Sequence, residues 1–403
     1  MTSPDHTPPG DGPSSVPATR VAWWNDRRIR AILYQVAVIG GVAAVIAYLV
    51  SNTLANLEAR QIATGFGFLG REAGFGISET PLDYSPADTY FRALTVGLVN
   101  TLLVSVIGIV LATLIGIVAG VARLSRNWIV ARLAGVYVEG LRNIPVLLQL
   151  FFWYSLITEG LPGPRQALNP LPGVFLSARG LKLPAPVWNS TYLWMGAAMV
   201  IGLVGAWAIA RWARRRQERT GQLFPTIRSG LALVIGLPLV VWLLGGAPMT
   251  MEVPKLTGFN FSGGVTITPE FTALLVGLVL YTGSFIAEIV RGGILAVPHG
   301  QTEAGLAIGL SRGQVLRLIT LPQALRVIIP PLTSQYLNLT KNSSLAVAIG
   351  FPDLVSVANT TINQTGQAVE GVAIIMAVYL TVSLSISGFM NWYNRRVAVR
   401  GAR

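Results

Sequence analysis

Hydrophobic residues in this chain gather into long stretches, and most charged residues lie between them. Eight stretches approach or reach the roughly 20 residues that a helix needs to cross a bilayer. They lie at residues Ala31–Val50, Ala93–Val121, Tyr137–Ile157, Tyr192–Ala210, Leu231–Gly246, Phe271–Val290, Val327–Gly350 and Val369–Met390. The fifth stretch is short, and the third contains polar residues near its start. The pattern predicts an all-α polytopic bundle of about eight transmembrane helices.

The composition supports a protein embedded in a lipid bilayer. The 403 residues are 52% hydrophobic and 12% charged, whereas about a quarter of the residues in soluble domains are charged. So few charges could not form the polar shell of a soluble chain of this length. The chain has no cysteine and only two histidines, His6 and His299. We therefore expect no disulfide, no thiolate nucleophile, no metal site and no cofactor.

The basic residues predict the orientation of the bundle. An even number of spans places both termini on one side, and Lys and Arg are enriched on the cytoplasmic side of bacterial membrane proteins. The segments on the N-terminal side hold 21 of the 30 Lys and Arg residues, and the opposite loops hold 6. Both termini are therefore predicted to be cytoplasmic. The net charge of +13 reflects this topology, so we expect no nucleic-acid partner.

The chain divides into segments of different composition. Residues 1–30 are typical of a disordered cytoplasmic tail, residues 31–50 form the first span, and residues 51–90 form an outer, periplasmic loop with several acidic residues. A transmembrane domain is predicted over residues 91–396, and residues 397–403 form a basic tail. Residues 155–269, rich in Pro and Gly and containing two spans, interrupt that domain as an insertion. Two inserted spans leave the orientation of the following helices unchanged.

The segment between the sixth and seventh spans predicts a helical elbow on the cytoplasmic side. Pro298 and Gly300 are expected to end the preceding helix. Thr302 and Glu303 can begin a new one, since an acidic residue is favoured near a helix N-terminus. Gly309 suits the left-handed conformation that closes a short helix.

A second short helix is expected to follow this glycine. Ser311 and Gln314 form a capping-box pattern, and Pro322 is expected to end the helix. Such an elbow would present a small, partly apolar knob to a groove on another protein, formed by Ala304, Leu306, Ala307 and Ile308. The alternative is an ordinary intracellular loop.

The elbow also resembles a known motif. Glu303-Ala304-Gly305, with Gly309 and Pro322 at their spacing, is similar to the EAA loop of permease subunits of binding-protein-dependent ABC importers. Gly305 stands where that family usually has alanine, and we expect a small residue to be tolerated there. The segments Tyr137–Gln149, Phe285–Gly293 and Asn338–Leu345 resemble the branch that transports polar and general amino acids. Residues 64–69 and the insertion resemble the larger permease subunit of general L-amino acid uptake systems.

This resemblance implies a type I ABC importer permease core in the bacterial inner membrane. It implies three kinds of partner besides the lipid bilayer: a cytoplasmic ABC ATP-binding subunit that receives the elbow, a second related permease subunit, and a periplasmic amino-acid-binding protein. The resemblance favours a heterodimer of two different permease subunits over a homodimer. The chain contains no Gly-Lys dipeptide, so it has no P-loop of its own. We therefore expect a transport subunit without catalytic residues, not an enzyme.

A polar helical face marks the seventh span. Its residues recur at three- and four-residue spacing and so share one side of a helix: Ser334, Gln335, Asn338, Lys341 and Asn342. Such a face inside a membrane can line a translocation path or bind neighbouring helices. In the second case Lys341 would extend to the membrane surface or pair with Glu288 or Asp353. Pro330 and Pro331 are expected to interrupt this helix and free carbonyl groups.

Two further polar positions admit the same two interpretations. Gln149 and Glu288 lie in hydrophobic stretches, where each could line the path or stabilise helix packing. Glu139 and Arg142 are three residues apart, and an ion pair within one helix is favoured over substrate contact.

Other function classes are weakly supported. Residues 65–70 match the dinucleotide-binding pattern without a preceding strand, and residues 309–313 match the nucleophile-elbow pattern without an acid and histidine nearby. Gly116 and Gly120 indicate close helix packing. The main alternative to an ATP-driven importer is a secondary transporter or channel for small polar solutes.

Overall fold

A computed structural model of the chain describes residues 27–59 and 64–398. It contains two compact units, residues 1–65 and residues 66–403. Within the first unit, α1 (Arg27–Ala59) includes the expected first span and extends beyond it at both ends. The predictions for the tail before residue 27 and for the terminal residues after 398 lie outside the described residues.

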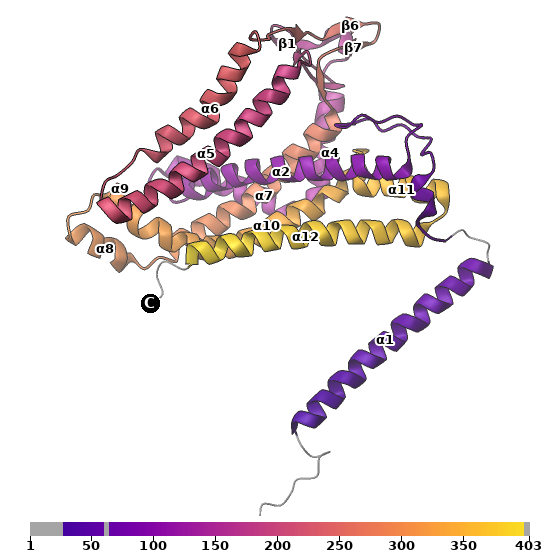
Figure 1. Cartoon of the computed structure of the whole chain (residues 1–403), viewed down its shortest axis with the longest axis horizontal. Helices are drawn as coiled ribbons and strands as arrows, with labels where there is room; N and C mark the ends of the chain where they lie inside the picture. The colour runs from indigo at the N-terminus through magenta and orange to yellow at the C-terminus, as the bar shows by residue number, and fades with distance from the viewer. Residues whose placement is uncertain (1–26, 60–63, 399–403) are drawn as a thin grey trace, which may run out of the picture. The chain divides into compact units, whose positions relative to one another are not determined.

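The second unit is built on long helices that run alongside one another (Figure 1). They are α2 (Tyr90–Ala122), α7 (Pro269–Leu295), α10 (Leu321–Asn342) and α12 (Ala368–Ala398), with the shorter α11 (Leu354–Thr365) joining the last two. Helices α2 and α7 approach closely at two glycines: a Cβ on Gly116 would lie 2.5 Å from Ile286, and one on Gly120 would lie 2.6 Å from a carbonyl oxygen of α7. The expected close packing at these glycines is confirmed.

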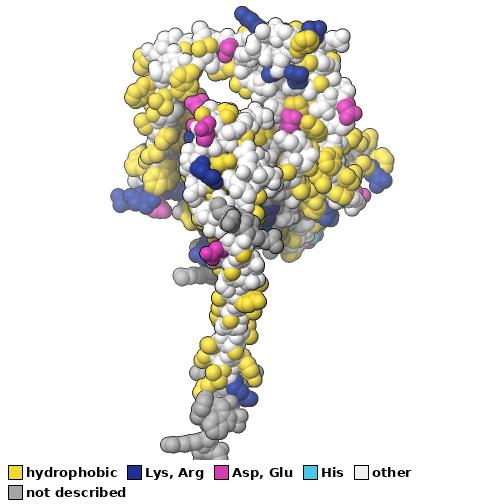
Figure 2. Space-filling model, turned by 90° about the vertical axis from the view of Figure 1, so that its right-hand side faces the viewer, with side chains coloured by type: hydrophobic (Ala, Val, Ile, Leu, Met, Phe, Trp, Pro, Cys, Tyr) yellow, Lys and Arg dark blue, Asp and Glu magenta, His cyan; other side chains and the backbone are white. Residues whose placement is uncertain are grey.

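Hydrophobic side chains both fill the centre of this bundle and cover its flanks. Leu274, Leu278 and Ile286 of α7 pack in the centre with Leu339 of α10 and Phe351. On the surface visible in Figure 2, hydrophobic side chains spread over much of both flanks. A surface of this kind is suited to contact with lipid.

The third expected span is not one helix. It consists of α3 (Trp128–Asn143) and α4 (Val146–Gly160), which are separated at Ile144 and Pro145. Proline disfavours a helical conformation in the residue before it, and this effect breaks the helix. The described residues contain seven helices long and apolar enough to cross a membrane, and α4 is a shorter apolar helix. The total of about eight spans stays a prediction.

The insertion folds as a helical hairpin topped by small sheets. Helices α5 (Ser190–Thr220) and α6 (Thr226–Leu244) pack against each other. The strands are β1 (Leu168–Leu171), β2 (Val174–Ser177), β3 (Gly180–Leu183), β4 (Ala185–Pro186), β5 (Met251–Glu252), β6 (Lys255–Thr257), β7 (Asn260–Ser262) and β8 (Val265–Ile267). An antiparallel sheet in the order β1-β2-β3-β8 joins the two ends of the insertion. The molecule is predominantly helical as predicted, but these strands were not predicted from the sequence.

The two ends of the second unit differ in character (Figure 1). One end carries the short helices α8 (His299–Ala307) and α9 (Arg312–Val315), the turn between α5 and α6, and the C-terminal end of α12. The opposite end carries the strands and the segment before α2, which includes the short helix η2 (Phe66–Gly70). The basic segments of this unit thus lie at one end, and the side of the membrane that this end faces stays a prediction.

Candidate functional site

The first arm of the elbow is α8, which begins earlier than expected. It starts at His299, directly after Pro298, so Gly300 lies in its first turn and does not break a helix. The fixed φ of proline suits the residue that precedes a helix, where no N–H is needed. The prediction that Thr302 and Glu303 begin the helix was therefore wrong.

A glycine closes the first arm as predicted. Gly309 adopts a φ of +87°, and its N–H donates to the Leu306 carbonyl at 3.0 Å. The Leu310 N–H donates to the Gly305 carbonyl at 3.2 Å. These two hydrogen bonds form a Schellman motif, which requires a left-handed residue at the glycine position.

The second arm is continuous with a long helix of the bundle. The Ser311 hydroxyl accepts from the Gln314 N–H at 3.4 Å, and the Gln314 side chain accepts from the Ser311 N–H at 2.8 Å, which confirms the capping box. Beyond α9 the chain passes through a π-helical turn, η4 (Leu316–Thr320), into α10. Pro322 lies in the first turn of α10 and does not end the arm, so that prediction was wrong.

The two arms pack on each other at Gly305. This residue is buried, and a Cβ there would lie 2.7 Å from Ile319 Cδ1 and 2.9 Å from Val315 Cγ2. An alanine at this position would therefore require both side chains to shift. The knob residues face outward as predicted, with Ile308 77% exposed. Glu303 is also exposed, and its carboxylate lies 3.1 Å from His299 Nδ1 in the same helix.

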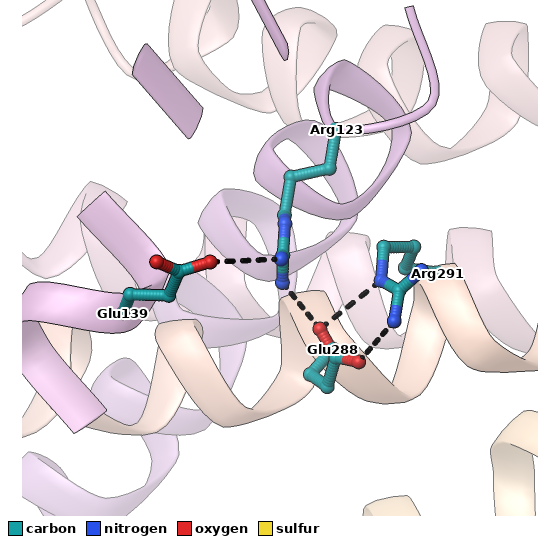
Figure 3. Close-up of polar contacts among 4 residues, drawn as sticks. All are labelled: Arg123, Glu139, Glu288 and Arg291. Carbon is teal, nitrogen blue, oxygen red and sulfur yellow. Dashed lines mark hydrogen bonds and ion pairs between the residues drawn. The ribbon is translucent and has the colours of Figure 1, made fainter. Parts of the chain in front are cut away.

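A charge cluster joins three helices near the start of the elbow (Figure 3). The Glu288 carboxylate of α7 pairs with Arg123 at the end of α2 and with Arg291, whose Nη2 lies 2.6 Å from Glu288 Oε1. The second guanidinium nitrogen of Arg123 lies 3.5 Å from Glu139 of α3. The Arg123, Glu288 and Arg291 side chains are each less than a third exposed. The cluster therefore links α2, α3 and α7 near the elbow, and α7 leads directly into α8.

Neither the favoured Glu139–Arg142 ion pair nor the alternative pairing of Lys341 with Glu288 or Asp353 forms among the described residues. Glu139 pairs with Arg123 and not with Arg142, whose guanidinium lies 4.9 Å from the centre of the Phe285 ring. Lys341 is exposed and forms no ion pair with any residue that the structure describes.

The polar face of α10 points away from the centre of the bundle. Ser334, Asn338 and Lys341 are exposed, and Gln335 and Asn342 are half-buried. The far side of the helix is buried at Ile329 and Leu332, and Ile328 packs against α7 at Gly293. The helix continues through Pro330 and Pro331, so the expected interruption was wrong. The face is therefore open to a neighbouring molecule or to lipid.

Gln149 acts at the break between α3 and α4. Its amide nitrogen donates to the carbonyls of Leu141 at 2.9 Å and Ile144 at 3.0 Å, groups that a helix end leaves without a partner. The side chain is buried, and Oε1 has no hydrogen-bond partner among the described atoms. The amide nitrogen of Gln149 thus stabilises the helix break, while its amide oxygen can still accept a hydrogen bond.

A buried polar junction in the N-terminal half of α2 was not predicted from the sequence. The Asn100 amide donates to the Pro352 carbonyl at 2.9 Å, and the Leu354 N–H donates to the Thr101 hydroxyl at 3.1 Å. Asp353 caps α11 by accepting from the Ser356 N–H at 2.8 Å, and burial raises the pKa of its carboxyl to about 6. The feature of the sequence that could have indicated this junction is Asn100, a polar residue within a hydrophobic stretch.

The described residues contain no group of three or more His, Cys, Asp or Glu side chains that could hold a metal ion.

Known proteins resemble the chain over nearly its whole length. The profile of the family described as "Binding-protein-dependent transport system inner membrane component" matches residues 223–399. The general L-amino acid transport system permease protein AapQ of Rhizobium johnstonii is 50% identical over 374 residues, covering 93% of this chain and 94% of AapQ. The glutamate/glutamine/aspartate/asparagine transport system permease protein BztB of Rhodobacter capsulatus is 42% identical, covering 93% of this chain and 95% of BztB. The shorter glutamate/aspartate import permease protein GltJ of Escherichia coli is 32% identical over 57% of this chain and 95% of its own length.

Proposed function

The chain belongs to the family of binding-protein-dependent transport system inner membrane components, and we propose that it imports amino acids with energy supplied by a separate ATP-binding subunit. It is a multi-pass inner-membrane permease subunit of an ABC importer. The relatives named for general L-amino acids and for glutamate, glutamine, aspartate and asparagine support amino acids as the transported class. The family assignment favours this role over a secondary transporter or channel.

The elbow is proposed as the element that receives work from the ATP-binding subunit. Its exposed apolar tip, at Leu306 and Ile308, offers a small contact surface beside the exposed carboxylate of Glu303. The observation that carries this proposal is the continuity of the second arm with α10. A displacement of the elbow would be transmitted along one helix to the polar face. Gly305, Gly309 and Pro322 are proposed to maintain the shape of the elbow, and Ala304 is proposed to contact the partner with the other knob residues.

The polar face of α10 is proposed as one wall of the translocation path. Its exposed amide, hydroxyl and ammonium groups would be unfavourable against lipid, so we propose that a second permease subunit covers it. The path would then lie between the two permeases, bounded here by Ser334, Gln335, Asn338, Lys341 and Asn342. Gln149 and Glu288 are proposed to support the path from the helix break and from the charge cluster.

The mechanism that follows is alternating access. ATP-driven closure of the partner ATPases would move the elbows, rotate α7 and α10, and open the path to a periplasmic amino-acid-binding protein. Hydrolysis and product release would return the path to the inward side. The permease contributes by binding its substrate with different affinity in the two states, because equal binding would shift nothing.

The test uses the complete importer. Glu303→Lys reverses the charge beside the docking tip, and Glu218→Lys makes the same change at an exposed site at the end of α5. We expect Glu303→Lys to reduce co-purification of the ATP-binding subunit and ATP-dependent amino-acid uptake, while Glu218→Lys leaves both unchanged. Uptake by vesicles that contain this chain alone and no nucleotide would refute the proposal.

A further inference from the structure

A cavity of about 650 Å³ lies at the end of the unit opposite the elbow. It is bounded by the segment before α2, by Asn100 and Leu103 of α2, and by the stretch from β8 into α7. Lys182 of β3 also lines it. None of its lining residues belongs to the polar face of α10. Its volume is in the range of small-molecule sites.

Lys182 places a buried ammonium group in this cavity. The residue is only 7% exposed, although lysine is almost never buried without a partner of opposite charge. Lys182 and Thr266 are cross-strand partners, so both side chains lie on the same face of the sheet. The Lys182 ammonium donates to the Thr266 hydroxyl, and no carboxylate that the structure describes lies within ion-pair distance of it.

The lysine therefore has hydrogen-bonding capacity that this chain does not use. An ammonium carries three donors, and its one recorded acceptor is a neutral hydroxyl. Burial, followed by the nearby charge of Arg179, lowers the pKa of Lys182. An anionic ligand would remove this penalty by supplying the missing charge.

Glu79 places a carboxylate in the same cavity. Asn100 donates to the Glu79 backbone carbonyl at 2.9 Å, and the Thr268 hydroxyl donates to the Glu79 carboxylate. Thr268 in turn accepts from the Phe271 N–H at 3.1 Å. The carboxylate is thus held at a fixed place, yet it forms no ion pair with Lys182.

The charged surroundings of Glu79 favour a cation beside it. Burial and then the nearby carboxylate of Glu270 raise the pKa of Glu79 to about 7. Glu270 on α7 accepts from the Tyr154 hydroxyl on α4 at 3.1 Å, and Lys182 on β3 is the basic group that shares the cavity. A cation near Glu79 would offset the repulsion between the two carboxylates.

We propose that this cavity binds the zwitterionic backbone of an α-amino acid. The ligand carboxylate pairs with Lys182, and the ligand ammonium pairs with Glu79. Leu103, Val265 and Phe271 form the apolar wall against the side chain. A simple anion or a simple cation would satisfy only one of the two groups, whereas a zwitterion satisfies both. The choice of an amino acid rests on the proposed function, and the site is an outer binding site distinct from the polar face of α10.

The experiment measures binding to the purified full chain in lipid nanodiscs by equilibrium dialysis. The probes are radiolabelled L-leucine and L-glutamine. Two further probes each lack one charge of leucine: 4-methylpentanoate has no α-amino group, and 3-methylbutylamine has no α-carboxylate. The variants are Lys182→Met and Glu79→Gln, and the matched controls are Lys255→Met and Glu72→Gln, at exposed positions outside the cavity.

We expect saturable binding of at least one amino acid to the wild-type chain, with each single-charge probe bound at least about tenfold more weakly. Lys182→Met and Glu79→Gln should each weaken amino-acid binding by about tenfold to a hundredfold, and the controls should not. Because the probe comparison uses the wild-type chain, it stands even if a variant fails to fold.

Absence of saturable binding to the wild-type chain, equal binding of the single-charge probes, or full binding by folded Lys182→Met would overturn the site. ATP-dependent uptake by the complete importer is measured in parallel. Normal uptake without cavity binding would remove this site and leave the proposed function intact, whereas absence of amino-acid uptake would remove the proposed function itself.

Discussion

Replacing Gly309 by alanine isolates one physical feature of the elbow, its left-handed backbone. The glycine has a φ of +87°, and a Cβ built on it meets nothing within 4 Å. The substitution therefore adds no clash, and its effect comes from backbone strain alone. A left-handed conformation costs a residue with a Cβ about 1–2 kcal/mol.

This strain sets the expected size of the effect. At about 1.4 kcal/mol for each factor of ten, the ratio of closed to opened elbow should fall by about 5- to 30-fold. The hydrogen bonds that open are those from the amides of Gly309 and Leu310. Hydrogen exchange at residues 309 and 310 should therefore accelerate by the same factor, and fewer amino-acid molecules should be imported per ATP hydrolysed.

Two further variants control for side-chain effects. Gly313 lies in α9 with an ordinary φ and no atom near its Cβ position, so Gly313→Ala should leave exchange and coupling unchanged. Gly309→Asn should reduce exchange protection and coupling less than Gly309→Ala does, because asparagine tolerates the left-handed region better than alanine. Equal coupling in Gly309→Ala and Gly313→Ala would refute the view that the left-handed turn maintains the elbow.

Three other results are expected. Glu288→Gln should lower the free energy of unfolding by about 1–3 kcal/mol, because it leaves a largely buried arginine without its main partner. Glu139→Gln should have a much smaller effect, because the Glu139 side chain is 70% exposed. Thermal denaturation in detergent compares the two variants, and equal losses of stability would contradict the role of the cluster. Gly116→Leu should disrupt the contact of α2 with α7, because even a Cβ at this position would lie 2.5 Å from Ile286. A normal yield of folded protein by size-exclusion chromatography would contradict the need for close packing of these two helices. Binding of L-leucine in the outer cavity should weaken about tenfold from pH 8 to pH 6. Burial and Glu270 raise the pKa of Glu79 to about 7, and this carboxylate must be ionised to pair with the ligand ammonium. Equal binding measured by dialysis across this pH range would exclude that pairing.

Features that depend on neighbouring residues could be predicted from the sequence. The hydrophobic stretches determined that the chain is a membrane-embedded helical bundle, because the bilayer requires long apolar helices wherever they occur. The left-handed turn at Gly309 and the capping box at Ser311 were also predictable, since a turn and a cap are satisfied within a few residues. The effects of Pro145 and Pro322 could not be told apart from the sequence. The helix ends before Pro145, whereas it continues past Pro322, which directly follows a π turn.

Contacts between distant parts of the chain were decided only by the tertiary structure. Glu288 could have paired with Lys341, but packing brings Arg123 to it across 165 residues of sequence. The sheet that pairs Lys182 with Thr266 joins segments 84 residues apart, and it creates the outer cavity at a place where the sequence had predicted only a loop. Charge and periodicity indicate which partners a residue can accept. The distance between two groups depends on how all the helices pack, and an ion pair forms only when packing brings the two charges within about 4 Å.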